Sequence, residues 1–448
     1  MDEKQEQSYE QEHDIYAGNV ELQKIKAEVH RQLLDVLDLN EARQIPIEKL
    51  HEQCCKRVDA LLTARQYPLS GPDRQRLLRE VMDEVFGFGP LEVFLRDPHV
   101  SDILVNGPHK IYIEKNGQLQ STKVTFMDEK HLMRIIHRIG SNVGRRIDES
   151  MPMLDARLPD GSRVNAIIPP LALDGPMVSI RRFGAIPIDI HRLLELDALT
   201  DEMSFFLEAC VRCKMNILIS GGTGTGKTTL LNTLSKWIPP GERVITIEDA
   251  AELQLQREHV VRLETRPPNI EGQGCITQRD LVRNSLRMRP DRIILGEVRG
   301  AETLDMLQAM NTGHEGSMAT VHANNPRDAL RRLENMVSMA GINYPIRAIR
   351  EQLSSALDVM VHLQRLTGGS RKIVKIVEIT TMEGETICLH DLFCFNQTGV
   401  DEAGNACGHF EACGVRPLLL NKLIAKGVEV SPELFQRRVL TRSCVKNN

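Results

Sequence analysis

Apolar residues recur every three or four positions in the first part of the chain. This helical spacing runs over residues 22–36, 47–62 and 77–85, and each segment carries one apolar face. The three segments predict a small helical module over residues 19–85. The stretch before it, 1–18, is polar and rich in Glu and Gln, so we expect an acidic, disordered tail.

Alternation of apolar and polar residues replaces the helical spacing after this module. Asn-Gly pairs at 106–107 and 116–117 separate short alternating runs, which is the strongest short-range signal for a β-hairpin. A helical segment at 128–139 interrupts the strands. These signals predict an α+β N-terminal domain over 86–183, and we interpret the segment 184–199 as a linker.

From residue 200 onward, short and almost continuously apolar runs alternate with helical spacing. We expect strands at 216–220, 243–247, 260–263, 292–295 and 317–321. Buried strands separated by helices are typical of a mostly parallel sheet in an α/β fold. The pattern becomes hairpin-like after residue 366, so the predicted domain, 200–436, carries a C-terminal extension before a polar tail at 437–448.

Composition limits the classes of partner. The formal net charge of the 448 residues is −5, and the acidic start alone accounts for it, so the remaining chain is balanced. Aromatic residues make up 4% of the chain, which leaves little material for stacking on bases, and we expect no nucleic-acid partner. No apolar run is long enough to cross a membrane and the acidic start differs from a signal peptide, so we expect a cytoplasmic protein.

The ten cysteines are scattered without the spacing of a disulfide framework, and we expect reduced thiols. Cys210 and Cys213 form one C-x-x-C, but they stand in a helical pattern without a second pair nearby. We favour a structural role for them over a metal or redox site, and we interpret Cys407 and Cys413 in the same way.

Residues 221–228 read GGTGTGKT, which fits the phosphate-binding pattern G-x-x-x-x-G-K-[ST]. The apolar strand before this P-loop and the amphipathic segment after it supply the required context. The glycines let backbone N–H groups point at phosphate oxygens, and the following helix adds its positive end. Lys227 would reach the β- and γ-phosphates of ATP, and Thr228 would offer its hydroxyl to Mg²⁺. The expected nucleotide contacts are Gly222, Thr223, Gly224, Thr225, Gly226, Lys227, Thr228 and Thr229.

Carboxylates follow two of the expected strands. One strand ends in Glu248 and Asp249, with Glu252 shortly after. If it neighbours the P-loop strand, these acids lie near the γ-phosphate, where a carboxylate can orient the attacking water; otherwise they form a charged loop edge. Gly296 stands where many P-loop enzymes carry an Mg²⁺-holding Asp, so Glu297 would act on the metal through water.

Basic residues near strand ends are open to two interpretations each. His322, at the end of an expected strand, either is structural or acts by sensing phosphate or coupling subunits. Arg181 and Arg182 end the first α+β domain beside the linker and could act as arginine fingers. Six more arginines are Arg279, Arg283, Arg287, Arg289, Arg292 and Arg299. They form either a plain charged surface or an interface.

Four blocks therefore stand in order: GGTGTGKTT (221–229), VITIEDAAELQ (244–254), DRIILGEVRG (291–300) and TVHANNP (320–326). The set resembles the secretion ATPase superfamily of type II secretion, type IV pili and type IV secretion, with its Walker A, acidic, Walker B and His boxes. Residues 259–300 look most like the tight-adherence (Tad/Flp) pilus branch, of CpaF type. The likeness runs over residues 75–436.

The resemblance implies a homohexamer of RecA-like ATPase domains, each preceded by a flexibly linked N-terminal domain, with ATP and Mg²⁺ between the two. By motif position, Glu252 would position the attacking water, Glu297 would be the Walker B acid and His322 the His-box residue. The two arginines that end the N-terminal domain would close on phosphate, and Arg163 is a weaker candidate for the same role.

As partner, the resemblance implies a membrane platform at the cytoplasmic face of the inner membrane, to which the ring would be peripheral. Our leading hypothesis is an ATPase motor for Tad/Flp-type pilus assembly or secretion. The alternative within the family is a type IV secretion ATPase for conjugation or effector export. A RecA-like nucleic-acid motor and a nucleotide sensor without turnover are further alternatives.

Overall fold

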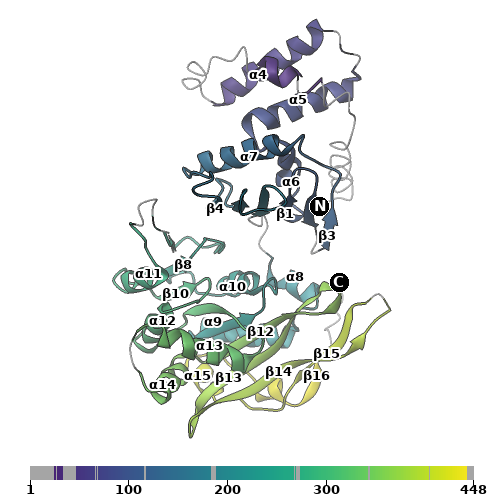
Figure 1. Cartoon of the computed structure of the whole chain (residues 1–448). Coiled ribbons are helices and arrows are strands. Elements are labelled where there is room, and N and C mark those ends of the chain that lie inside the picture. The colour runs from purple at the N-terminus through teal and green to yellow at the C-terminus, as the bar shows by residue number, and fades with distance from the viewer. Residues whose placement is uncertain are drawn as a thin grey trace. The chain divides into compact units, whose positions relative to one another are not determined.

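The chain divides into two compact units, Met1–Ala185 and Ile186–Asn448. The computed structural model describes residues 25–26, 28–33, 47–65, 67, 69–115, 118–182, 188–266, 268, 273–341, 344–402 and 404–440. Each unit has its own sheet (Figure 1). Each also has its own buried hydrophobic residues. The expected acidic tail, the start of the expected linker and the end of the expected C-terminal tail lie outside the described residues. The finer division into domains stays a prediction.

Helices open the first unit, as the apolar spacing predicts. α4 spans Ile47–Ala64, α5 spans Gly71–Phe86, and residues 28–33 are also helical. The start of α5 follows Ser70, whose hydroxyl accepts from the backbone N–H of Asp73 at 3.2 Å. The apolar faces of these helices meet in one small core of their own.

A six-stranded antiparallel sheet forms the rest of the first unit. Its strands are β1 (Val100–Asn106), β2 (Ile111–Lys115), β3 (Gln118–Ser121), β4 (Met153–Arg157), β5 (Arg163–Ile167) and β6 (Met177–Arg181). Their order is β3-β2-β1-β6-β5-β4, and β2 pairs antiparallel with β1 and with β3, as expected, while the second Asn-Gly pair lies outside the described residues. The helical segments beside the sheet are η1 (Gly89–Leu91), α6 (Glu92–Arg96) and α7 (Glu129–Asn142). Apolar residues of α6 and α7 share one core with the sheet.

A ten-stranded mixed sheet is the centre of the second unit. Its strands are β7 (Ile217–Gly221), β8 (Val244–Glu248), β9 (Val260–Glu264), β10 (Arg292–Leu295), β11 (Met318–His322), β12 (Val359–Arg365), β13 (Arg371–Glu383), β14 (Thr386–Val400), β15 (Ala406–Ala412) and β16 (Arg438–Leu440). Their order is β16-β15-β14-β13-β12-β7-β11-β10-β8-β9. Pairing is parallel from β12 through β9 and antiparallel from β12 through β16.

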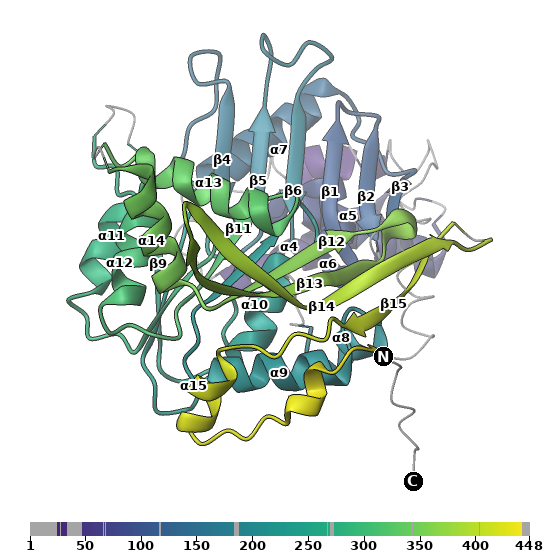
Figure 2. The same cartoon turned by 90° about the horizontal axis from the view of Figure 1, so that it is seen from below.

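Helices cover both faces of this sheet. They are α8 (Ile190–Glu195), α9 (Asp201–Arg212), α10 (Lys227–Ser235), α11 (Gln278–Ser285), α12 (Glu302–Asn311), α13 (Pro326–Ser338), α14 (Ile346–Ala356) and α15 (Leu420–Ala425), with the short turns η2 (Thr367–Gly369) and η3 (Pro432–Phe435). Figure 2 shows α9 and α15 on one side of the sheet and α13 and α14 on the other. In β7, Ile217 and Ile219 join the core under α9 while Leu218 joins the core under α13, which explains the unbroken apolar run.

One expectation about the second unit needs correction, although all five predicted strands are confirmed. The sheet is mixed rather than mostly parallel, because the C-terminal strands β13 to β16 extend it by antiparallel pairing. Residues 438–440, expected to start the tail, pair with β15 as β16. The expected linker contains α8, which begins after its cap Asp189. Among the helices that the structure describes, none is long and apolar enough to cross a lipid bilayer.

Candidate functional site

The loop at 222–226 connects β7 to α10, as the P-loop pattern predicts. Gly224 (φ +69°) and Gly226 (φ +95°) adopt the left-handed backbone that favours glycine, and Gly226 caps the start of α10. The Thr225 hydroxyl donates to the carbonyl of Gly222 at 3.0 Å and stabilises the curl of the loop. The N-terminus of α10 therefore follows directly on a tight glycine loop, an arrangement that suits phosphate.

Two cations contact the loop. The ammonium of Lys227, the first residue of α10, donates to the carbonyls of Gly221 at 3.0 Å and Gly222 at 2.7 Å. Arg371, at the start of β13, donates to the carbonyl of Gly224 at 2.8 Å. The P-loop pattern identifies the lysine, whereas the arginine comes from 147 residues further along the chain and escapes any local motif.

The strand order answers whether the strand that ends in Glu248 neighbours the P-loop strand. β7 lies between β11 and β12, so β8, which ends in Glu248, is not its neighbour. The segment after β8 reaches the P-loop helix by another route, because the Asn232 side chain of α10 accepts from the backbone N–H of Gln254 at 2.9 Å. Glu252 is partly buried and belongs to this tethered segment. The structure thus associates the acidic segment with the P-loop helix rather than with the P-loop strand.

Glu248 is buried, and the sequence does not distinguish it from the other two acids. Its Oε1 accepts from the backbone N–H groups of Glu252 at 2.8 Å and Leu253 at 2.9 Å. Its buried Oε2 has no hydrogen-bond partner among the described residues. Burial raises the pKa of Glu248 to about 7, although the two N–H groups act in the opposite direction. Glu248 therefore positions the backbone of Glu252 and changes its charge near neutral pH.

The glycine at position 296 makes room for this buried carboxyl. A Cβ atom on Gly296 would lie 2.8 Å from Cγ of Glu248, closer than side chains tolerate. The hydroxyl of Thr320 on β11 donates to the carbonyl of Gly296 at 2.6 Å and fixes the end of β10. The absence of the Asp that many P-loop enzymes carry here has a steric reason, because the Glu248 side chain occupies that space.

Glu297, the predicted Walker B acid, lies in an ion-pair cluster. Arg299 donates to Oε2 of Glu297 at 2.6 Å and also reaches Asp249 at 3.3 Å. The cluster joins acids that follow β10 and β8 through one half-exposed guanidinium, so it orients them more than it stabilises the fold. Arg299 is therefore part of the acidic site and not a member of a plain charged surface.

Two histidines lie on the strands that flank β7. His322 ends β11 opposite Gly221 in the parallel register, which places the expected residue beside the start of the P-loop. His362, on β12, is buried opposite Ser220, and its Nδ1 lies 2.9 Å from the Ser220 hydroxyl. Burial lowers the pKa of His362, against a backbone hydrogen bond with Asn324 that raises it. His362, which the motif analysis missed, bridges the P-loop strand and the segment after β11.

Much of the arginine cluster has structural partners. Arg292 is fully buried at the start of β10 and forms an ion pair with Glu242. Asp305 on α12 accepts from Arg279 and Arg283, both at 2.8 Å. These three arginines connect helices and strands within the unit. Neither alternative considered from the sequence, a plain charged surface or an interface, describes this role.

The candidate arginine fingers belong to the first unit. Arg181 is exposed at the end of β6, with Asp102 at 3.7 Å. Arg163 pairs with a carboxylate on β4 at 2.7 Å. Arg182 is half-buried, donates to two backbone carbonyls, and burial lowers its pKa. Arg181 is the most accessible of the three, and a role of any of them toward nucleotide stays a prediction.

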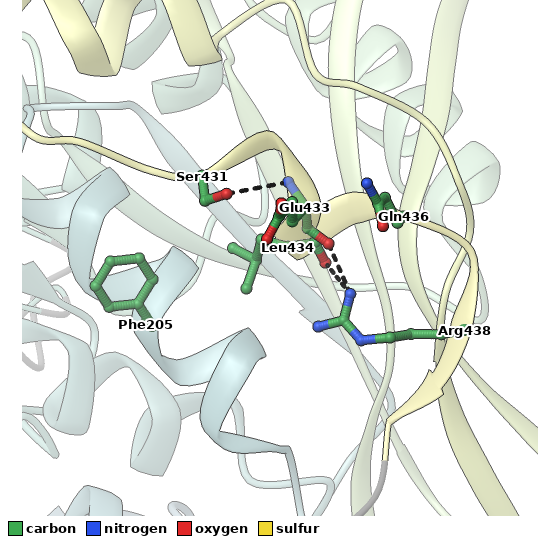
Figure 3. Close-up of a pocket in the computed structure, with 6 residues that line it drawn as sticks. All are labelled: Phe205, Ser431, Glu433, Leu434, Gln436 and Arg438. Atoms are coloured by element: carbon green, nitrogen blue, oxygen red, sulfur yellow. Dashed lines mark hydrogen bonds between the residues drawn. The ribbon is translucent and has the colours of Figure 1, made fainter.

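A pocket of about 430 Å³ lies elsewhere on the second unit (Figure 3). Its lining residues are Phe205, Ser431, Glu433, Leu434, Gln436 and Arg438. The Arg438 guanidinium donates to the carbonyl of Glu433 at 2.7 Å, so this cation already serves the local fold. None of the predicted site residues lines this pocket, and it is separate from the P-loop.

Metal binding at the P-loop would depend on few protein ligands. In the described part of the chain, no group of three or more His, Cys, Asp or Glu side chains could hold a metal ion. Thr228 is the second residue of α10, directly after Lys227, which suits a hydroxyl ligand for Mg²⁺ that otherwise rests on phosphates and water. Cys210, on α9, and Cys213, directly after it, are buried in the same core, in agreement with a structural role.

Known proteins resemble this chain over most of its length. The family model described as type II/IV secretion system protein matches residues 84–412. A Mycobacterium tuberculosis protein with the provisional name of a conjugal transfer protein is 37% identical over 313 residues, 68% of this chain and 88% of that protein. Conjugal transfer protein TrbB of Rhizobium radiobacter is 31% identical over 308 residues, 68% of this chain and 90% of that protein. Type IV secretion system protein VirB11 of Brucella abortus is 32% identical over 306 residues, 62% and 84% of the two chains. The family match covers more than half of the chain, which therefore belongs to the type II/IV secretion system protein family.

Proposed function

We propose that this chain is an ATPase that powers a secretion system of the conjugal-transfer type. The observation that carries the proposal is the tether from Asn232 to Gln254, because it associates a carboxylate segment with the helix that opens at Lys227. The names of the relatives favour type IV secretion over the Tad/Flp pilus reading that residues 259–300 suggested. The type IV secretion ATPase is therefore our first candidate, and the ATPase for pilus assembly is the second.

In this proposal the P-loop binds the triphosphate and the acids prepare water for attack. The N–H groups of residues 222–229 and the Lys227 ammonium bind phosphate oxygens, and Mg²⁺ on Thr228 supplies charge neutralisation when bound. Glu252 orients the attacking water, and its backbone is positioned by Glu248. Glu297 acts through water near the metal, with Arg299 as its counter-ion. A guanidinium from another copy of the chain would neutralise negative charge on the γ-phosphate, and Arg181 is the best candidate for this role.

The proposed assembly is a homohexamer in the cytoplasm that docks on an inner-membrane platform protein. Membership of the type II/IV secretion system protein family supports this proposal, since the family resemblance implies a ring hexamer. The rival is a nucleic-acid motor, and the balanced charge and few aromatic residues disfavour it. The nucleic-acid motor has its own test below, although we expect no direct contact with nucleic acid.

The test is ATP turnover of the full chain and three variants. We expect Lys227→Ala and Glu252→Ala each to lower turnover by ~10²-fold or more, since each removes a group that acts on the transition state. Lys236→Ala is the matched control, because Lys236 is an exposed lysine at the other end of α10. Unchanged turnover in both site variants would refute the assignment. Duplex and single-stranded DNA added at low salt should leave turnover unchanged, and strong stimulation would instead favour the nucleic-acid motor.

A further inference from the structure

Two cysteines far from the P-loop contact one another across the antiparallel part of the sheet. Cys394 lies on β14 and Cys413 directly follows β15, and their Sγ atoms are 3.3 Å apart. The register pairs Cys394 with Glu411, and the Cys413 N–H donates to the carbonyl of Leu392 at 2.9 Å. The two thiols are therefore diagonal neighbours on one face of the strand pair, with both side chains partly exposed.

Charged groups beside the pair make the two thiols unequal. Lys375 on β13 forms an ion pair with Asp391 at 2.5 Å, and the Cys394 sulfur lies 3.8 Å from the Asp391 carboxylate. The contact between the two sulfurs lowers the pKa of Cys413 and raises that of Cys394, whereas Lys375 favours the thiolate of either cysteine. Cys413 is consequently the better nucleophile, and Cys394 is placed to react second.

The other cysteines of these strands do not join the pair. Cys407 is on β15 and pairs with Gly399, which is further along β14 than Cys394. Cys388 lies near the start of β14, on the other side of Cys394. The described residues hold no set of three or more ligands for a metal here. The geometry fits a dithiol and not a four-thiolate site.

We propose that Cys394 and Cys413 form a reactive dithiol that exchanges with low-molecular-weight disulfides, a modification site beyond the proposed ATPase function. The Cys413 thiolate attacks one sulfur of a disulfide RSSR, forming a mixed disulfide and releasing RS⁻. Cys394 then attacks the Cys413 sulfur, the second RS⁻ leaves, and the two thiol protons end on the released thiolates. The balance is RSSR + 2 Cys–SH → Cys394–Cys413 disulfide + 2 RSH. Closure requires the sulfurs to approach from 3.3 Å to about 2.05 Å.

The experiment uses the full chain equilibrated with mixtures of reduced and oxidised glutathione, quenched in acid, and alkylated for peptide mass spectrometry. We expect the wild type to yield linked Cys394 and Cys413 peptides that are two hydrogen atoms lighter than the reduced pair. Cys394→Ser should trap glutathione on Cys413, because the resolving thiol is gone. Cys413→Ser should leave Cys394 mostly as a free thiol, because the first nucleophile is absent.

Cys407 is the internal control, because it is exposed on β15 and pairs with Gly399 instead of a cysteine. Formation of the Cys394–Cys413 disulfide should require at least about tenfold less oxidised glutathione than addition of glutathione to Cys407. The reason is that the second step is intramolecular, which gives the resolving thiol a high effective concentration. Full alkylation of Cys394 and Cys413 under conditions that modify Cys407 would overturn the proposal. So would glutathione that stays on Cys413 in the wild type without closure.

Discussion

The substitution Glu248→Gln tests the claim that a buried carboxyl underlies the acidic segment. Gln keeps an oxygen that can accept from the N–H groups of Glu252 and Leu253, so it reproduces the contacts of the protonated acid. It removes only the ability to ionise. The variant therefore separates the charge of Glu248 from its packing against Gly296.

The magnitude follows from the raised pKa. The pKa of Glu248 rises from 4.5 to about 7 in the folded chain, mainly through burial. Below pH 4.5 both folded and unfolded states hold the proton and the group adds no pH dependence. Between 4.5 and about 7 only the unfolded chain ionises, so wild-type stability falls as pH rises, by about 1.4 kcal/mol per pH unit. Above that window the loss is constant at roughly 3 kcal/mol.

The assay is thermal unfolding of the wild type and of Glu248→Gln between pH 5 and pH 8. We expect the two midpoints to lie close together at pH 5 and to diverge as pH rises, with the variant higher by roughly 6 °C at pH 8. Glu258→Gln, at an exposed position, controls for the loss of one surface carboxylate. Parallel curves for wild type and Glu248→Gln would refute the buried, proton-exchanging carboxyl.

Two further predictions concern the supports of the site. Asn232→Ala removes the acceptor for the Gln254 N–H, so steady-state kinetics should show kcat lowered ~10-fold with an almost unchanged KM for ATP, and a change in KM alone would contradict the tether. Arg292→Met leaves Glu242 without its buried partner and should cost about 3–5 kcal/mol in denaturant unfolding, whereas the exposed Arg287→Met should cost almost nothing. Equal effects of the two arginine substitutions would show that the burial of Arg292 has no energetic role.

Local patterns in the sequence predicted what depends on local physics. The spacing of apolar residues located β7, β8, β10 and β11, because each strand buries both faces and reads as an unbroken apolar run. The glycine pattern located the loop for the same reason, since φ angles at Gly224 and Gly226 depend on their own residue type.

Pairing between distant segments escaped the sequence. β12 pairs with β7, and nothing in the spacing of either strand encodes a partner so far along the chain. This pairing places His362 of β12 beside Ser220 of β7, and the pairing of β13 with β12 brings Arg371 to Gly224 of the loop. The prediction that Arg292 belongs to a surface or an interface was wrong for a related reason. Its charge is typical of a surface residue, and its ion-pair partner Glu242 lies 50 residues earlier in the chain. The role of Gly296 became clear only once Glu248 was seen beside it.

The central place of β7 also governs how the polypeptide is made. Its two neighbours, β11 and β12, begin at residues 318 and 359. During translation both edges of β7 therefore stay unpaired until these later segments have been synthesised. Open apolar edges recruit other chains readily. A message that ends between these neighbours therefore yields a fragment with an open edge of β7 that is prone to aggregate, so the sheet of the second unit requires intact synthesis of the C-terminal part.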